Sequence, residues 1–247
     1  MFKNIIYFVF SKLVKLSIVE THTLNTAWIT PGGNILDLGA NHGAFSHNLS
    51  ERFDSHLYLV EANLNLANEL KQNPKFNVLH AAASGKLGRI TFNISSSDDA
   101  STINSLCRLP ITASVIVDGL NYAEILKYFD IQTVDVLKVD VEGAEIDFIA
   151  AMSDQELLAI KQITIEFHDR HQYYPYETTM GTINRLVTLG FSDMSMVNNT
   201  LDVLLVNNKL CESLVLERLR LKLLTKPFLK VFWTTQNYLI SRNILYK

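Results

Sequence analysis

Four side chains capable of acid–base chemistry follow two apolar runs in the second half of the chain. Asp140 closes the run VDVLKV, and Glu142 follows two residues later. Glu166 and His168 end the next run, QITIEFH, where alternation places them on the same side of an extended chain. A carboxylate closing so apolar a run usually serves a function, and histidine can take a hydroxyl proton near neutral pH. These four residues are the candidate catalytic residues.

Simpler interpretations of the same residues stay open. His168 can instead hydrogen-bond the following loop, and Glu145 is typical of a first helical turn, where a carboxylate favours the helix dipole. A metal site built from Glu166, His168, His171 and Asp140 has no recognised ligand spacing. We therefore expect no metal.

A glycine turn is the strongest signal in the first half of the chain. The sequence ILDLGANHGAFS ends a strand in Asp37, turns at Gly39 and Gly43, and enters a helix. Such a turn brings backbone N–H groups and a helix N-terminus close to a ligand. The spacing lacks the middle glycine of a dinucleotide fingerprint, which disfavours a nicotinamide oxidoreductase. Asp37 can attract an amino group or a sulfonium centre through water or backbone contacts.

Two further positions complete a candidate cofactor site. Glu61 follows Asp37 by 24 residues, one strand–helix–strand step, and can accept both ribose hydroxyls of an adenosine. In LHAAASGKLG, small residues follow the next strand, and Ala82 is the expected contact of an adenine ring. The glycine turn, together with Asp37 and Glu61 at the ends of two successive strands, points to S-adenosylmethionine. A structural turn beside a surface glutamate is the simpler alternative.

Strand and helix patterns alternate between residues 33 and 206, which predicts an α/β fold with a parallel sheet covered on both faces. The expected strands are 34–38, 57–61, 77–80, 134–139, 162–167 and 201–206. The expected helices are 43–53, 64–72, 121–129, 144–152 and 177–189. An edge strand or hairpin is expected at 89–94, a polar loop at 95–105, and a final hairpin pairing 191–197 with 201–206.

The composition excludes several classes of protein. With 247 residues, 48% hydrophobic types and 5 Pro, the chain is neither disordered nor of low complexity. Its 2 cysteines suffice for neither a disulfide framework nor a four-cysteine zinc site, and they fit a reducing, cytoplasmic compartment. Residues 21–208 hold 22 acidic residues against 11 basic ones, so no nucleic-acid partner is expected.

Both ends of the chain are basic and apolar. Mixed three- and four-residue spacing predicts an amphipathic helix near the N-terminus, whose apolar run is too short to span a membrane. Residues 209–247 hold eight basic residues against two acidic ones, and Pro227 should interrupt any helix there. Packing on the body is the simplest expectation for both ends. Peripheral membrane contact and a homodimer are the alternatives.

Together these motifs resemble the FkbM family of S-adenosylmethionine-dependent methyltransferases. The block LKVDVEGAE is the most specific part, whereas LDLGANHGAFS also suits neighbouring methyltransferase families. VEAN, AASGKLG, STI and IEFH complete the match. Ala62 replaces a frequent proline and Val117 a usual leucine, and neither departure removes a chemical group.

The resemblance implies a fold and a division of the chain. The fold is a Rossmann-like seven-strand methyltransferase sheet, mostly parallel with an antiparallel last strand, with helices on both faces. A methyltransferase domain is expected over 33–208, between an N-terminal helical extension, 1–32, and a basic helical extension, 209–247.

The resemblance also implies methyl transfer from S-adenosylmethionine to a hydroxyl of a sugar or small natural product. We assign Gly39, Asn41 and Gly43 to its methionine part, Glu61 to the ribose and Ala82 to the adenine side. Asp140 is expected near the sulfonium or the acceptor. His168 is the preferred base, with Glu142 or Glu166 in reserve. A loop over 95–120 and the segment 169–180 are expected to wall the acceptor pocket. A non-catalytic S-adenosylmethionine-binding protein, attached to a membrane or a partner, is the alternative function.

Overall fold

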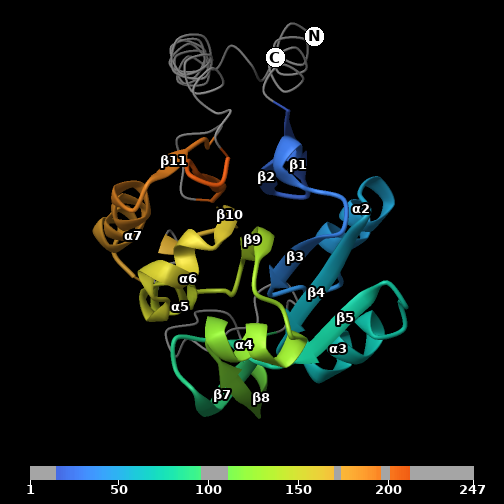
Figure 1. Cartoon of the computed structure of the whole chain (residues 1–247). Helices are drawn as coiled ribbons and strands as arrows, with labels where there is room; N and C mark the ends of the chain where they lie inside the picture. The colour runs from blue at the N-terminus through green and yellow to red at the C-terminus, as the bar shows by residue number, and fades with distance from the viewer. Residues whose placement is uncertain (1–14, 96–110, 170–173, 196–200, 212–247) are drawn as a thin grey trace, which may run out of the picture.

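A seven-stranded sheet is the centre of the computed structural model, which describes residues 15–95, 111–169, 174–195 and 201–211 (Figure 1). The strand order is β11-β12-β10-β9-β3-β4-β5. The strands are β3 (Gly33–Leu38), β4 (Ser55–Glu61), β5 (Phe76–His80), β9 (Val134–Val139), β10 (Ile160–Ile165), β11 (Phe191–Asp193) and β12 (Val203–Asn207). β12, the last described strand, runs antiparallel to β10 and β11, while β10, β9, β3, β4 and β5 are mutually parallel. The predicted Rossmann-like sheet of seven strands, mostly parallel with an antiparallel last strand, is confirmed.

Apolar side chains cover both faces of this sheet, and all six residues of its central strand β9 are buried. In β3, Leu36 and Leu38 join one core cluster and Ile35 joins the other. The first cluster includes side chains of α4 (Tyr122–Phe129), α5 (Glu145–Ala151), α6 (Asp154–Leu158) and α7 (Tyr176–Thr188). The second includes side chains of α2 (Ala44–Arg52) and α3 (Leu64–Leu70). Helices therefore pack on both faces, as predicted.

A separate sheet follows β5. In it β8 (Ile111–Leu120) pairs with β6 (Ala82–Ala83) and, antiparallel, with β7 (Gly88–Ser95). The predicted edge strand 89–94 is thus β7, although it belongs to this smaller sheet. The expected loop 95–120 is wrong for residues 111–120, because the run ITASVIV is rich in β-branched residues that favour a strand. Residues 96–110 lie outside the described residues.

The expected N-terminal helical extension is wrong over residues 15–32. This part forms a β-hairpin of β1 (Leu16–Val19) and β2 (His22–Asn25), followed by the short helix η1 (Thr26–Trp28). Glu20, at φ 54, makes the tight turn between the strands. All four residues of β2 are buried, because β2 packs against β10 and β12. The hairpin therefore packs on one face of the sheet. It brings His22 to the edge where the parallel strands end, beside Asp140.

The predictions for the two basic ends concern mainly residues 1–14 and 212–247, which lie outside the described residues. Among the helices that the structure describes, none has the length and apolar character needed to cross a membrane.

Candidate active site

A pocket lies at the carboxyl ends of β3, β4 and β9. Its lining includes six of the residues that the sequence singled out: Gly39, Asn41, Glu61, Ala82, Asp140 and Glu142. Parallel strands end at this edge of the sheet, so segments distant in sequence meet there. The structure therefore joins most of the candidate cofactor residues, though not Asp37 or Gly43, with two of the candidate catalytic residues in one cavity.

The glycine turn has a backbone that only a few residue types allow. Gly39 has φ +74, and a Cβ on it would lie 1.8 Å from the carbonyl oxygen of Asp140. The N–H groups of Gly39 and Ala40 donate to the carbonyl oxygen of Val60, at 3.0 and 3.2 Å. Gly43, with φ +76, caps the start of α2 and does not line the pocket. The turn is thus packed against both neighbouring strand ends.

The Glu61 carboxylate fixes the turn from the end of β4. Its Oε2 accepts the N–H of Asn41 at 2.8 Å, and its Oε1 accepts the N–H of Asn63 at 2.7 Å. Burial raises the pKa of Glu61 above its ordinary value, although the two N–H groups and Lys138 act in the opposite direction. Each carboxylate oxygen retains a second lone pair, so Glu61 can still accept hydrogen bonds from a molecule in the pocket.

Asp37 does not reach the pocket. Its side chain is fully buried below the turn, where Oδ1 lies 3.1 Å from the Lys138 ammonium. Its Oδ2 accepts the Ser46 hydroxyl at 2.6 Å. The prediction that Asp37 attracts a cationic ligand therefore does not fit the structure, because Lys138 already balances the charge. Asp37 instead ties β3 to α2 and β9.

Lys138 is the central cation of the site. Besides Asp37, its Nζ donates to the carbonyl oxygen of Gly39 at 2.9 Å and lies 3.4 Å from Asp140 Oδ2. Burial alone would lower the pKa of Lys138, but Asp37 and Asp140 outweigh it and hold the pKa above its ordinary value. Burial likewise opposes ionisation of Asp140, yet Lys138, with His22 and His168, holds the pKa of Asp140 well below its ordinary range. Asp140 therefore supplies a fixed negative charge to the pocket.

His168 lies behind the pocket lining, between three carboxylates. Its Nδ1 lies 2.9 Å from Glu145 Oε1, and its Nε2 lies 3.3 Å from Glu142 Oε2 and 3.9 Å from Asp140 Oδ1. Burial would lower the pKa of His168, but these carboxylates outweigh it and raise the pKa to about 10. The ring is therefore protonated at neutral pH and does not suit the predicted role of base.

Glu142 lines the pocket, as Asp140 does, but its pKa lies near the working range of an enzyme. Burial raises the pKa of Glu142 to about 8; the His168 cation opposes this rise, and the neighbouring carboxylates add to it. Its backbone has φ 50, in the left-handed region, and Gly143 after it has φ 96. A carboxylate with such a pKa can accept a proton from a hydroxyl group and release it again.

Glu145 and Tyr174 position His168, and the sequence did not reveal this function. Glu145 is fully buried at the first position of α5, where Oε1 accepts the N–H of Gly143 at 2.9 Å. Its Oε2 accepts the Tyr174 hydroxyl at 2.7 Å, and that hydroxyl accepts the N–H of His168 at 2.8 Å. Tyr174, expected to wall the acceptor pocket, is thus part of a hydrogen-bond network. His171 and Tyr173, in the same segment, lie outside the described residues.

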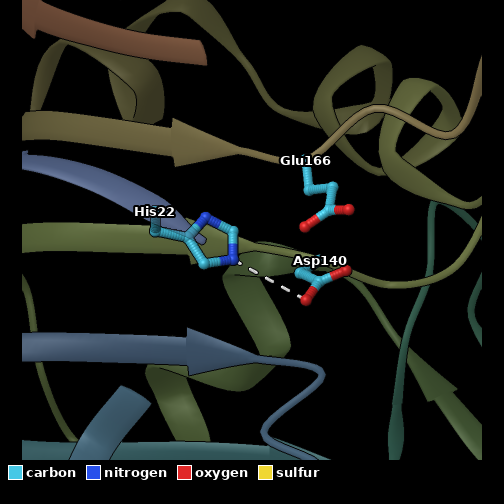
Figure 2. Close-up of side chains that lie close together, drawn as sticks. All are labelled: His22, Asp140 and Glu166. Carbon is cyan, nitrogen blue, oxygen red and sulfur yellow. Dashed lines mark ion pairs between the residues drawn. The ribbon is translucent and has the colours of Figure 1, made fainter. Parts of the chain in front are cut away.

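Glu166 belongs to a different group from His168. Its Oε2 accepts the Thr21 hydroxyl at 3.1 Å, on the β1–β2 turn. It lies with Asp140 and His22, and His22 Nε2 is 3.7 Å from Asp140 Oδ2 (Figure 2). No signal in the sequence identified His22, because a hairpin early in the chain carries it to the site. Of the metal set weighed from the sequence, Glu166 and His168 therefore fall in different clusters that share Asp140, and the fourth member, His171, lies outside the described residues.

One family model covers more than half of the chain. The family model of the methyltransferase FkbM domain matches residues 37–192. Among curated proteins no significant match is found. Among solved structures, the chain is similar to a candidate methyltransferase from an antibiotic biosynthesis pathway of Anabaena variabilis ATCC 29413, with 11% identity and a TM-score of 0.33. The match covers 72% of this chain and 60% of that one.

Proposed function

This chain belongs to the FkbM methyltransferase family, and from that premise we propose that it transfers a methyl group from S-adenosylmethionine to a hydroxyl oxygen. The acceptor we propose is a sugar or another small natural product. One observation carries the proposal. A single pocket is lined both by the turn residues and Glu61, which suit an adenosyl group, and by the carboxylates of Asp140 and Glu142.

The residues of the pocket fit S-adenosylmethionine. Ala81, Ala82 and Ala83 line one part with small side chains, which leave room for a flat ring against the backbone. The spare lone pairs of Glu61 suit the two ribose hydroxyls. Asp140, held ionised, gives the negative charge that a sulfonium or amino group needs. When bound, this cofactor supplies a methyl group already activated by the sulfonium.

The protein then has to orient the acceptor and remove its hydroxyl proton. Glu142 is the base in this proposal, because it lines the pocket while His168 does not. His168 holds Glu142 at 3.3 Å and is itself held by Glu145 at 2.9 Å. His168 is therefore a positioning residue, and its cation sets the pKa at which Glu142 becomes ionised.

We expect His168→Gln to shift the pH dependence of methyl transfer toward alkaline pH. The substitution removes a cation that stabilises ionised Glu142, so the rising limb of kcat/KM should move up by about one pH unit. The measurement is a pH profile of kcat/KM for both proteins. Loss of turnover by about 10²–10⁴-fold at every pH would instead identify His168 as the base.

The proposed activity is tested with purified full-length chain, isotopically methyl-labelled S-adenosylmethionine and a library of sugars and hydroxylated natural products. We expect label to appear in a base-stable methyl ether, identified by mass spectrometry. Label in an amine or a carboxylic ester would contradict transfer to a hydroxyl. Cofactor binding without methylation of any acceptor would favour the non-catalytic alternative.

A further inference from the structure

We infer that His22, Asp140 and Glu166 bind a divalent transition-metal cation at the edge of the pocket. Each residue offers one ligand atom, and the three atoms lie within 4.8 Å of one another. Figure 2 shows the three side chains directed toward a common space. The inference rests on these residues and not on the proposed methyl transfer.

The His22 ring is the strongest evidence for a cation. His22 is 1% exposed, and among the described residues its Nε2 has no hydrogen-bond partner. Its Nδ1 lies 3.2 Å from the Thr164 hydroxyl. In the neutral ring that donates Nδ1–H to that hydroxyl, the lone pair of Nε2 points at Asp140 Oδ2, 3.7 Å away. Two such acceptors face each other favourably only with a cation between them.

This arrangement is also the usual one for a metal-binding histidine. Such a ring holds the metal with one nitrogen and donates its other N–H to a neighbouring oxygen, which fixes its orientation. Here Thr164, fully buried in β10, provides that oxygen. The separation of 3.7 Å between Nε2 and Oδ2 is close to the roughly 3.4 Å expected for two ligands of one tetrahedral zinc ion.

The hairpin that carries His22 is firmly attached to the sheet. The N–H of Thr23 donates to Asp202 Oδ1 at 2.8 Å, and its hydroxyl donates to Asp202 Oδ2. The N–H of Asn25 donates to the Gln162 side chain at 2.9 Å, and that side chain donates back to the Asn25 carbonyl at 3.0 Å. His22 is thus placed in advance, while the partly exposed Asp140 and Glu166 side chains can adjust.

The local charge favours a divalent cation. Asp37 and Asp140 flank one ammonium, Lys138, and Glu166 lies beside Asp140, so these four side chains carry two negative charges in excess. Lys138 lies 3.4 Å from Asp140 Oδ2 and would repel a cation at that oxygen, so the excess of carboxylates has to outweigh this repulsion. One imidazole and two carboxylates suit Zn²⁺ or Mn²⁺ better than Mg²⁺, which prefers oxygen ligands. Three protein ligands leave a coordination position for another molecule.

A second cluster, Asp140, Glu142 and His168, is less suited to a metal. Both ring nitrogens of His168 already lie beside carboxylates, Glu145 at 2.9 Å and Glu142 at 3.3 Å. His22 Nε2 has only Asp140 Oδ2 beside it among the ion pairs of the described residues, at the longer distance of 3.7 Å, and forms no hydrogen bond within the described residues. His22 also lies outside residues 37–192, so the family match does not itself imply this site.

The test is calorimetric titration of the chelator-treated, full-length chain with ZnCl₂, MnCl₂ and MgCl₂. We expect one Zn²⁺ or Mn²⁺ per chain and weaker binding of Mg²⁺. His22→Phe and Glu166→Gln should each weaken Zn²⁺ binding at least about tenfold, and Thr164→Val should weaken it about 10–100-fold through the lost ring partner. Glu142→Gln is the matched control and should retain the affinity.

Circular dichroism verifies the fold of each variant, and Mn²⁺ binding is followed in parallel by electron paramagnetic resonance. Glu166→Gln keeps the shape of the side chain and an oxygen for Thr21, so it remains informative even if His22→Phe does not fold. Absence of a one-to-one site in the wild type would overturn the inference and leave His22 and Asp140 as an ion pair. Affinity lost in Glu142→Gln but kept in Glu166→Gln would overturn it in favour of the second cluster.

Discussion

Replacing Glu142 by glutamine should slow methyl transfer by about 10²–10⁴-fold, the usual contribution of a general base. Glu142 lines the pocket, and burial raises its pKa to about 8. Glutamine keeps the size of the side chain but cannot accept a proton. Single-turnover rates with saturating cofactor measure the effect, and the affinity for S-adenosylmethionine should change only a few-fold.

The pH dependence gives this prediction a second readout. Only ionised Glu142 can take the proton, so kcat/KM should rise with pH and level off above about pH 8. The remaining kcat/KM of Glu142→Gln should not show this rise with pH. Glu124→Gln, on the exposed face of α4, is the control and should behave as wild type. A wild-type rate and profile in Glu142→Gln would show that another group is the base.

Replacing Lys138 by methionine should reduce the free energy of unfolding by about 3–5 kcal/mol, because it leaves buried carboxylates without their cation. Asp37 is fully buried and lies 3.1 Å from the Lys138 ammonium. The carbonyl oxygen of Gly39 would lose a donor at 2.9 Å, so the turn should loosen as well. Urea unfolding at pH 7 measures the effect.

Lys161→Met is the matched control for this prediction. Lys161 also pairs with a buried aspartate, Asp135, at 2.7 Å, but its side chain is 25% exposed. Asp135 keeps the N–H and hydroxyl of Thr30 as donors, so we expect a loss of about 1 kcal/mol or less. An equally small loss in Lys138→Met would contradict the assigned role of Lys138.

The pH dependence of stability provides a further check. The folded-state pKa of Asp140 is lowered, so its contribution to stability is present above its unfolded pKa, about 3.9, and is lost as the pH falls below that value. Lys138→Met removes the main cause of that lowering. The difference in stability between wild type and variant should therefore shrink below about pH 4.

The central sheet could be predicted because its strands are short apolar runs bounded by turns. The prediction for β9, Val134–Val139, matches the structure residue for residue, since all six positions are buried. β8 was missed because only two of its ten residues, Val117 and Gly119, are buried. Its sequence therefore lacks the alternation of apolar and polar residues that identifies a half-buried strand. The β1–β2 hairpin was mistaken for a helix because its stability depends on β10 and β12, far along the chain.

The pocket residues could be predicted because each lies at the end of a strand or in the turn that follows it, and both are recognisable in the local sequence. Gly39, Asn41, Glu61, Ala82, Asp140 and Glu142 all line the pocket. Interactions between distant segments could not be predicted: Glu145 with His168, and His22 with Asp140. The sequence does contain one signal of the buried charge network beneath the pocket. Lys138 stands inside an apolar strand, and a lysine buried there requires a carboxylate partner.

The most direct test of the account is equilibrium binding of S-adenosylmethionine and its demethylated product to the full-length chain by calorimetry. We expect one molecule per chain and no comparable affinity for NAD. Glu61→Gln should weaken binding about 10–100-fold, because it replaces a carboxylate that orders the turn and accepts ribose hydroxyls. Folded wild-type protein without affinity for either compound, or with an affinity that Glu61→Gln leaves unchanged, would contradict the proposed function of this pocket.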